Sequence, residues 1–235
     1  MQVVAGSSTI FPASSKNQIQ QVEKIIKHPD HAAKSVDLAI LVLKQKFIFN
    51  KNVNKISLNI RGQKRGDFLS YCVTYGWGKK SKKGIYELSG AKLSMTNINH
   101  CIINLPKAAK TLRERKDLIC TKSPKDVSIC TGDFGAPLLC RYRIGKVFQT
   151  YLMGTAIKLS GDYDCRQNRK KEAVYETMQD RLNLKMPGHI RWLKKTMDKL
   201  QNPNVERSSS KMDKPKLLTL LATLFTAKIA AIISQ

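Results

Sequence analysis

The sequence predicts an all-β fold, an antiparallel sandwich or barrel, followed by one helix near the C-terminus. Short runs rich in Val and Ile recur along the chain and are bounded by Gly, Pro, Ser or Asn, as antiparallel strands are. Six cysteines without a C-x-x-C pair are typical of a disulfide framework. One late segment carries apolar residues at helical spacing.

Eight segments have the length and composition of strands, and turn-forming residues end each one. They are residues 2–10, 18–27, 37–43, 68–77, 86–94, 137–143, 147–157 and 173–178. A helix is expected after Pro187-Gly188, because four apolar residues at offsets of three, seven and ten would share one face. These residues are Ile190, Leu193, Met197 and Leu200.

The polar segment 201–216 reads as a linker, and the apolar segment 217–235 follows it. As a helix, residues 217–233 would reach roughly 26 Å, the lower edge of a membrane span. The tail can be the signal for a glycosylphosphatidylinositol anchor, a membrane span, or an amphipathic helix at a membrane or partner. Lys228 weakens the first two, because a lysine within the bilayer costs roughly 2.5–3.5 kcal/mol.

The chain of 235 residues is strongly basic, with a formal charge of +25 from 42 Lys and Arg against 17 Asp and Glu. This excess favours acidic partners, such as sulfated glycans, anionic lipid or nucleic acid. It is also typical of a solvated surface without a specific partner. We expect neither a metal nor a cofactor, since no cysteine or histidine pattern of a metal site is present.

The even number of cysteines indicates an oxidising, secretory compartment, so we expect an extracellular protein. Residues 1–6 nevertheless have neither the basic region nor the apolar region of a signal peptide.

Residues 130–140 read C-T-G-D-F-G-A-P-L-L-C. This segment resembles the nucleophile loop of the chymotrypsin and trypsin-like serine proteases, C-x-G-D-S-G-G-P-L-x-C. Phe134 stands where that family has its nucleophilic serine, and Ala136 replaces a glycine. A phenyl ring cannot attack a carbonyl carbon, so the resemblance implies the family's fold without its chemistry.

Other segments carry the same resemblance. Residues 4–7, 25–29, 71–78, 173–175 and 192–197 match further family segments, and residues 35–43 resemble the D-I-A-L-L-x-L strand. The last match places Asp37 at the carboxylate of the catalytic triad, where it would be vestigial. The family's general base, a histidine in a T-A-A-H-C motif, is missing from this chain, since His28 belongs to the H-P turn and His31 lies outside such a motif.

The resemblance also assigns every cysteine. It implies disulfides between Cys72 and Cys140, between Cys101 and Cys120, and between Cys130 and Cys165. Spacing alone leaves 15 pairings open.

The implied fold is two antiparallel Greek-key barrels, the first incomplete at its N-terminus, with a C-terminal helix. Residues 1–62 would be the remnant of the first barrel, 63–186 the second barrel with three disulfides, and 187–200 the helix. A barrel without its opening strands should have exposed sheet edges.

The resemblance gives four further positions a role. The backbone N–H groups of Gly132 and Phe134 would be the remnant of the oxyanion hole, and Ser128 would lie at the base of the specificity pocket. Asp133 would be the carboxylate that pairs with a new N-terminal ammonium on activation. The ring of Phe134 could fill part of the pocket, since burial of an aromatic side chain is favourable.

We therefore predict a non-catalytic homologue that acts as a binding or regulatory protein on a protein partner in an extracellular cascade. A sulfated glycan or acidic surface, and membrane attachment through residues 217–235, are further expected interactions. Two alternatives are open: a serine endopeptidase whose N-terminal part is missing from this chain, and a truncated product without function.

Overall fold

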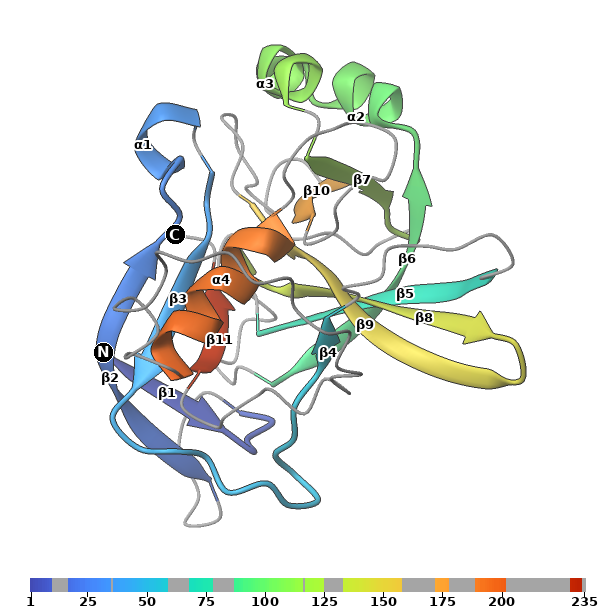
Figure 1. The fold of residues 1–235 in the computed structure, drawn as a ribbon. Helices are drawn as coiled ribbons and strands as arrows, with labels where there is room; N and C mark the ends of the chain where they lie inside the picture. Colours follow the sequence, from blue (N-terminus) through green and yellow to red (C-terminus); the bar gives the residue numbers. More distant parts are fainter. Residues whose placement is uncertain are drawn as a thin grey trace, which may run out of the picture.

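The computed structural model describes residues 1–9, 17–34, 36–58, 68–77, 87–115, 117–124, 133–157, 172–177, 189–201 and 229–233. Strands dominate these residues (Figure 1). The strands are β1 (Gln2–Ala5), β2 (Gln18–Lys27), β3 (Ala39–Leu43), β4 (Ser57–Leu58), β5 (Phe68–Gly76), β6 (Ser89–Thr96), β7 (Leu118–Lys122), β8 (Pro137–Ile144), β9 (Val147–Ala156), β10 (Glu172–Thr177) and β11 (Ile229–Ile233). The helices are α1 (His31–Lys34), α2 (Ile98–Asn104), the 3-10 turn η1 (Pro106–Ala108), α3 (Ala109–Glu114) and α4 (His189–Gln201).

Six strands close into an antiparallel barrel. Their order is β10-β7-β6-β5-β8-β9, and β10 pairs back with β9 to complete the ring. Along β8 burial alternates, and Leu138, Cys140 and Tyr142 point into the barrel. Closure pairs both edges of every barrel strand, which protects the sheet from edge-to-edge association.

The hairpin of β8 and β9 turns at Gly145. Ile144 pairs with Val147, which leaves a two-residue loop. Gly145 has a φ of 60°, the positive value that such hairpin turns require at their first central residue. Beyond the turn the two strands pair as far as Pro137 and Thr155, so the longest ladder of the barrel depends on this one glycine.

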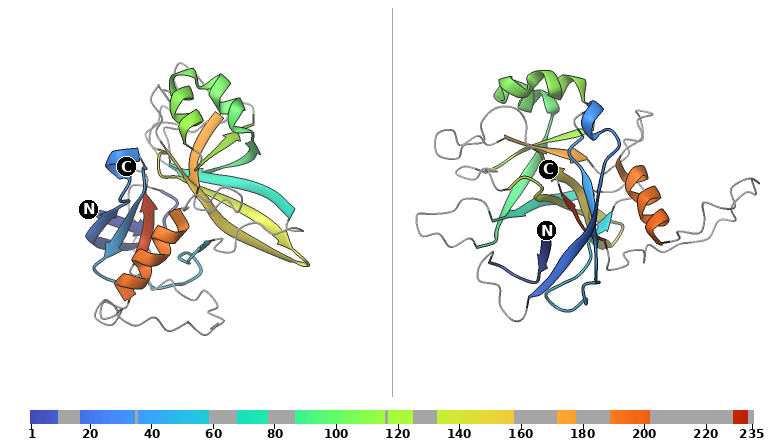
Figure 2. Two further views of the ribbon diagram at one scale, coloured as in Figure 1. Left: turned by 45° about the horizontal axis from the view of Figure 1, so that its top comes forward. Right: turned by 90° about the vertical axis from the view of Figure 1, so that its left-hand side faces the viewer.

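The N-terminal residues form a second, four-stranded sheet in the order β1-β2-β3-β11. All five residues of β3 are buried, which explains why its sequence, A-I-L-V-L, is an uninterrupted apolar run. Ile40 packs in a cluster with Leu193 of α4 and Leu152 of β9. This cluster joins the sheet, α4 and the outer face of the barrel, which lie side by side in Figure 2.

Among the described residues the N-terminal sheet is open, with β1 and β11 as its outer strands, and the edge of β3 is covered. β11 pairs with it in antiparallel register, with Ile232 opposite Ile40. Residues 229–233 of the apolar tail are thus a strand. The sequence left three readings of this tail open, an anchor signal, a membrane span and an amphipathic helix, and none of them anticipates this pairing. Extended apolar residues satisfy the backbone groups of an adjacent buried edge, which a helix cannot do. Within the described part of the chain, no helix has the length and hydropathy to cross a membrane.

The predicted C-terminal helix is confirmed as α4, which begins at His189. Ile190, Leu193 and Met197 are buried as predicted, whereas Leu200 is 36% exposed. α4 ends one residue later, so Leu200 lies in the terminal turn, beyond the surface that the helix covers.

Two of the three implied disulfides are present. Cys72 is bonded to Cys140 across the paired strands β5 and β8, and Cys101 of α2 is bonded to Cys120 of β7. The third pair, Cys130 and Cys165, lies outside the described residues.

Candidate functional site

The segment that contains Phe134 is a tight turn at the start of β8. The N–H of Ala136 donates to the C=O of Asp133 at 3.0 Å. Gly135 has a φ of 86°, which a type II turn requires at its third residue. The N–H of Gly135 donates to the C=O of Ala156 at 2.8 Å, and the N–H of Ala156 donates to the C=O of Ala136 at 2.9 Å. These bonds hold the turn against the end of β9.

The ring of Phe134 is half-buried and packs against a hydrophobic cluster. This cluster contains Ile157 after β9, Val174 of β10 and residues of α2 and α3, including Leu112. The N–H of Ile157 donates to the C=O of Val174 at 3.1 Å, so the two segments behind the ring are bonded to each other. The aromatic side chain is therefore part of the packing between barrel and helices.

The neighbouring Asp133 lies against Gly76 at the end of β5. A Cβ atom on Gly76 would be only 2.1 Å from Oδ1 of Asp133, so any larger residue there would displace this carboxylate. Asp133 is half-buried. Its predicted role as an activation carboxylate stays a prediction, as do the roles of Gly132 and Ser128, which lie outside the described residues.

Asp37 belongs to the N-terminal sheet rather than to the barrel. It is half-buried in the segment that precedes β3, between the buried residues Val36 and Leu38. The core positions on both sides fix its backbone. Its assignment as a vestigial triad carboxylate stays a prediction.

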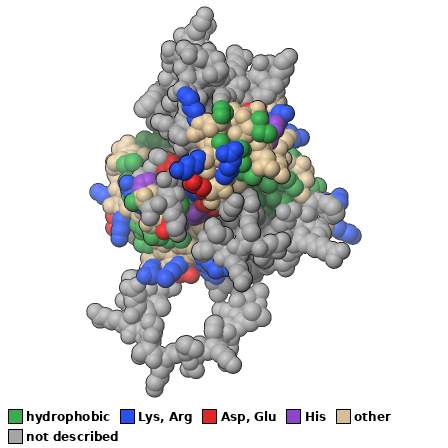
Figure 3. Space-filling model, turned by 90° about the horizontal axis from the view of Figure 1, so that it is seen from above, with side chains coloured by type: hydrophobic (Ala, Val, Ile, Leu, Met, Phe, Trp, Pro, Cys, Tyr) green, Lys and Arg blue, Asp and Glu red, His purple; other side chains and the backbone are tan. Residues whose placement is uncertain are grey.

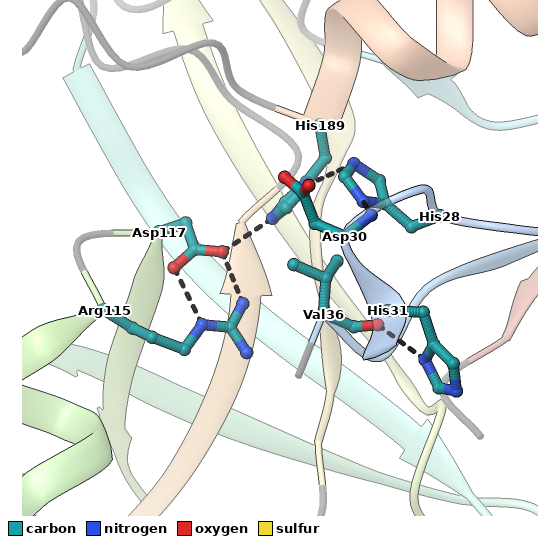
Figure 4. A network of polar contacts seen from close by, with 7 residues as sticks. All are labelled: His28, Asp30, His31, Val36, Arg115, Asp117 and His189. Atoms are coloured by element: carbon teal, nitrogen blue, oxygen red, sulfur yellow. Dashed lines mark hydrogen bonds and ion pairs between the residues drawn. The ribbon is translucent and has the colours of Figure 1, made fainter. Parts of the chain in front are cut away.

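All four histidines have defined partners. His31 donates from Nδ1 to the C=O of Val36 at 2.9 Å. His100 lies with Nε2 3.1 Å from Oε1 of Glu172. His28 and His189 contact each other in the network of Figure 4. The described ranges contain no group of three His, Cys, Asp or Glu residues that could hold a metal ion.

The network in Figure 4 runs from Asp30 to Arg115 through two histidines and a carboxylate. The backbone N–H of Asp30 donates to Nδ1 of His28 at 3.1 Å, so Nδ1 of His28 carries no proton. Nε2 of His28 must then donate to Nδ1 of His189, 3.3 Å away. Nε2 of His189 in turn donates to Oδ2 of Asp117 at 2.8 Å. The two rings thus connect the backbone of Asp30 to the carboxylate of Asp117.

The network joins three parts of the molecule. His28 follows β2, Asp117 immediately precedes β7 of the barrel, and His189 begins α4. The ring of His28 also packs edge-on against Trp192, with centroids 4.6 Å apart. Both histidines are buried, so the arrangement is a structural clamp and leaves no ring nitrogen to accept a proton from a substrate.

Asp117 is the charged end of the clamp. It forms an ion pair with Arg115 in addition to its bond from His189. Burial alone would raise the pKa of Asp117, but the hydrogen bonds from His189 and Arg115, together with the positive charge of Arg115, hold that pKa well below its usual range. Sequence reasoning missed this residue, because its partner His189 is 72 positions away and only the fold brings the two together.

Comparison with known proteins agrees with this architecture. The family model described as Trypsin matches residues 1–182. The inactive CLIP domain-containing serine protease A28 of Anopheles gambiae is 32% identical over 133 residues, which are 53% of this chain and 34% of that protein. Two rat proteins, granzyme-like protein 1 and granzyme B, are each 31% identical over 59% of this chain and 56% of their own length. The chain thus spans between one third and a little over half of these relatives.

Proposed function

Because the chain belongs to the trypsin family of serine proteases, we propose that it is a non-catalytic member, which acts by binding rather than by hydrolysing peptide bonds. Phe134 carries this proposal. It occupies the serine position of a motif in which both flanking cysteines, Gly132, Asp133, Gly135 and Pro137 are retained.

The geometry of the turn supports the proposal. A nucleophile in this family presents an oxygen from the turn to the substrate, with a histidine in hydrogen-bond reach as base. Phe134 has no such oxygen, and its ring packs against the cluster that contains Ile157 and Val174. A substrate side chain entering this region would have to displace an apolar ring from an apolar surface. Additional sequence before residue 1 would leave this substitution unchanged.

The relatives are compatible with the proposal. The name of the Anopheles gambiae relative describes it as inactive, so serine proteases without activity occur among the proteins to which this chain is similar. The two disulfides are typical of an extracellular protein. We therefore include in the proposal an extracellular location and a protein partner in a proteolytic cascade.

Labelling with a fluorophosphonate tests the missing nucleophile, because the reagent reacts covalently with an activated serine. The purified, disulfide-bonded chain should remain unlabelled, while active trypsin in the same reaction is labelled. Phe134→Ser should also remain unlabelled, because the four histidines are engaged elsewhere. The proposal would be contradicted if the folded wild-type chain were labelled stoichiometrically and the heat-denatured chain were not labelled.

A further inference from the structure

Four adjacent strands of the barrel contain no acidic residue, and two of them, β6 and β8, contain basic residues. β6, β5, β8 and β9 are neighbours in the sheet, and none of them contains Asp or Glu. Cys72 and Cys140 face the barrel interior. The adjoining residues Tyr71 and Arg141, which pair with each other, therefore face outward.

The outward side chains form a diagonal row across these strands, which we call the cation–aromatic row: Lys92, Tyr71, Arg141 and Phe148. Nζ of Lys92 lies 5.4 Å from the centre of the Tyr71 ring. Nη1 of Arg141 donates to the hydroxyl of Tyr71 at 3.4 Å, and its Cζ lies 4.6 Å from the centre of the Phe148 ring. Each cation is thus held against an aromatic ring, which restricts its conformations before any ligand arrives.

The row opens to solvent toward the tip of the β8–β9 hairpin, which projects from the body of the molecule (Figures 1 and 2). Arg143 and Lys146 are exposed near this tip, and Phe148 is 49% exposed. Lys122 of β7 is exposed too and pairs with Ser94 of β6, but Glu172 of β10 lies directly opposite it on the other side, so the acid-free surface ends at β7.

The helical end of the molecule differs from this surface. In Figure 3, which views that end, basic side chains are scattered and acidic side chains lie among them. The overall charge of +25 is therefore not enough to select a binding surface, whereas the absence of acidic residues from four neighbouring strands is.

We infer that the cation–aromatic row binds a sulfated glycan chain. Lys92 lies on β6 and Arg141 on β8, with β5 between them, so the two cations are held on strands roughly 10 Å apart. Two separated, fixed cations suit an anionic polymer better than a single anion. Guanidinium groups bind tetrahedral oxyanions in bidentate geometry. A surface for single-stranded nucleic acid would present free ring faces to the bases, but Lys92 and Arg141 cover these rings. The disulfides favour an extracellular polyanion.

This inference rests on the proposal that the chain acts by binding, and it is tested with heparin as the probe. The dissociation constant of the full chain is measured over a range of salt concentrations. Lys92→Gln combined with Arg141→Gln removes both cations of the row, and should weaken binding roughly tenfold and lower the salt dependence by about two counterions. Lys194→Gln combined with Lys195→Gln removes the same charge from the exposed face of α4 and should change the constant less than about twofold.

A variant without a change of charge distinguishes binding by the cation–aromatic row from nonspecific electrostatic attraction to the basic chain. Phe148→Leu keeps every charge but removes the ring that positions Arg141, so binding should weaken by about two- to fivefold with an unchanged salt dependence. Circular dichroism and thermal unfolding establish that each variant is folded.

Equal weakening by the row variant and the α4 variant would overturn the inference, as would an unchanged dissociation constant for Phe148→Leu. Tighter binding to single-stranded DNA or to phosphatidylserine vesicles than to heparin would overturn the assignment to a sulfated glycan. Heparin binding does not depend on hydrolysis. If the chain reacted with fluorophosphonate and still bound heparin through the row, the proposed loss of catalysis would be wrong and the proposed glycan binding would stand.

Discussion

Replacing Asp117 by Asn is expected to destabilise the fold at neutral pH. The carboxylate accepts a hydrogen bond from His189 and forms an ion pair with Arg115, whose side chain is 11% exposed. Asparagine keeps the shape and can accept one of these bonds, but it removes the charge. The guanidinium of Arg115, which is largely buried, would then lose the negative charge of Asp117, which is costly.

The expected loss follows from this burial. Removal of one partner from a buried ion pair costs about 3–5 kcal/mol. The side chain of Asp117 is 19% exposed, so solvent screens part of the interaction, and we expect about 2–3 kcal/mol. Because the pKa of Asp117 is lowered in the folded state, its contribution is complete above about pH 4 and is lost as the pH falls below that value.

Denaturant unfolding, followed by the fluorescence of Trp192 against His28, measures both effects. The difference in unfolding free energy between wild type and variant should be largest near neutral pH and should shrink as the pH falls below about 4. Asp198→Asn, on the exposed side of α4, is the control and should change stability by less than about 0.5 kcal/mol. A difference for Asp117→Asn that is as small as this control, or that stays constant into the acid range, would show that the charge of Asp117 does not stabilise the fold.

Three further changes test other parts of the fold. Gly76→Ala should cost about 1–3 kcal/mol, since the new Cβ would overlap the carboxylate of Asp133, and a wild-type melting temperature would contradict the packing. Replacement of Cys101 and Cys120 by Ser removes a crosslink between residues 19 positions apart and should lower the free energy of unfolding by about 3 kcal/mol. A decrease of less than about 1 kcal/mol in denaturant unfolding would contradict a stabilising role of this disulfide. Deletion of residues 229–235 uncovers the edge of β3. We therefore expect the truncated chain to self-associate in size-exclusion chromatography and its β3 amides to exchange faster. If neither change occurs, β11 is not needed to protect this edge.

Much of the fold could be predicted from local sequence patterns. β3 is a short apolar run between polar residues, and α4 has apolar residues at helical spacing, so a single segment carries the whole signal in each case. The resemblance added what spacing could not give, namely the pairing of Cys72 with Cys140 and of Cys101 with Cys120.

The helices α2 and α3 were missed although a signal was present. Ile98, Cys101, Ile102 and Leu105 follow one another at helical offsets, and the side chain of Asn97 accepts a hydrogen bond from the N–H of Asn99 as an N-cap. Each helix is only six or seven residues long, and short helices depend on tertiary packing for their stability.

The clamp and the position of β11 could not be predicted from local patterns. His28 and His189 are 161 residues apart, and only the docking of α4 on the N-terminal sheet brings their rings together. The strand β11 reads I-A-A-I-I, which suits a helix as well as a strand. The backbone groups along the edge of β3 favour the strand over the helix, and this edge exists only in the folded sheet.

We expect this trypsin-family chain not to cleave peptides, and a digest of a mixed peptide library measures such cleavage without assuming a substrate. The purified, disulfide-bonded chain and its Phe134→Ala variant are incubated with the library, and mass spectrometry detects any new peptide termini. We predict no cleavage by either protein. Reproducible cleavage by the wild-type chain, with a pattern or rate that changes in Phe134→Ala, would show that this turn belongs to an active site.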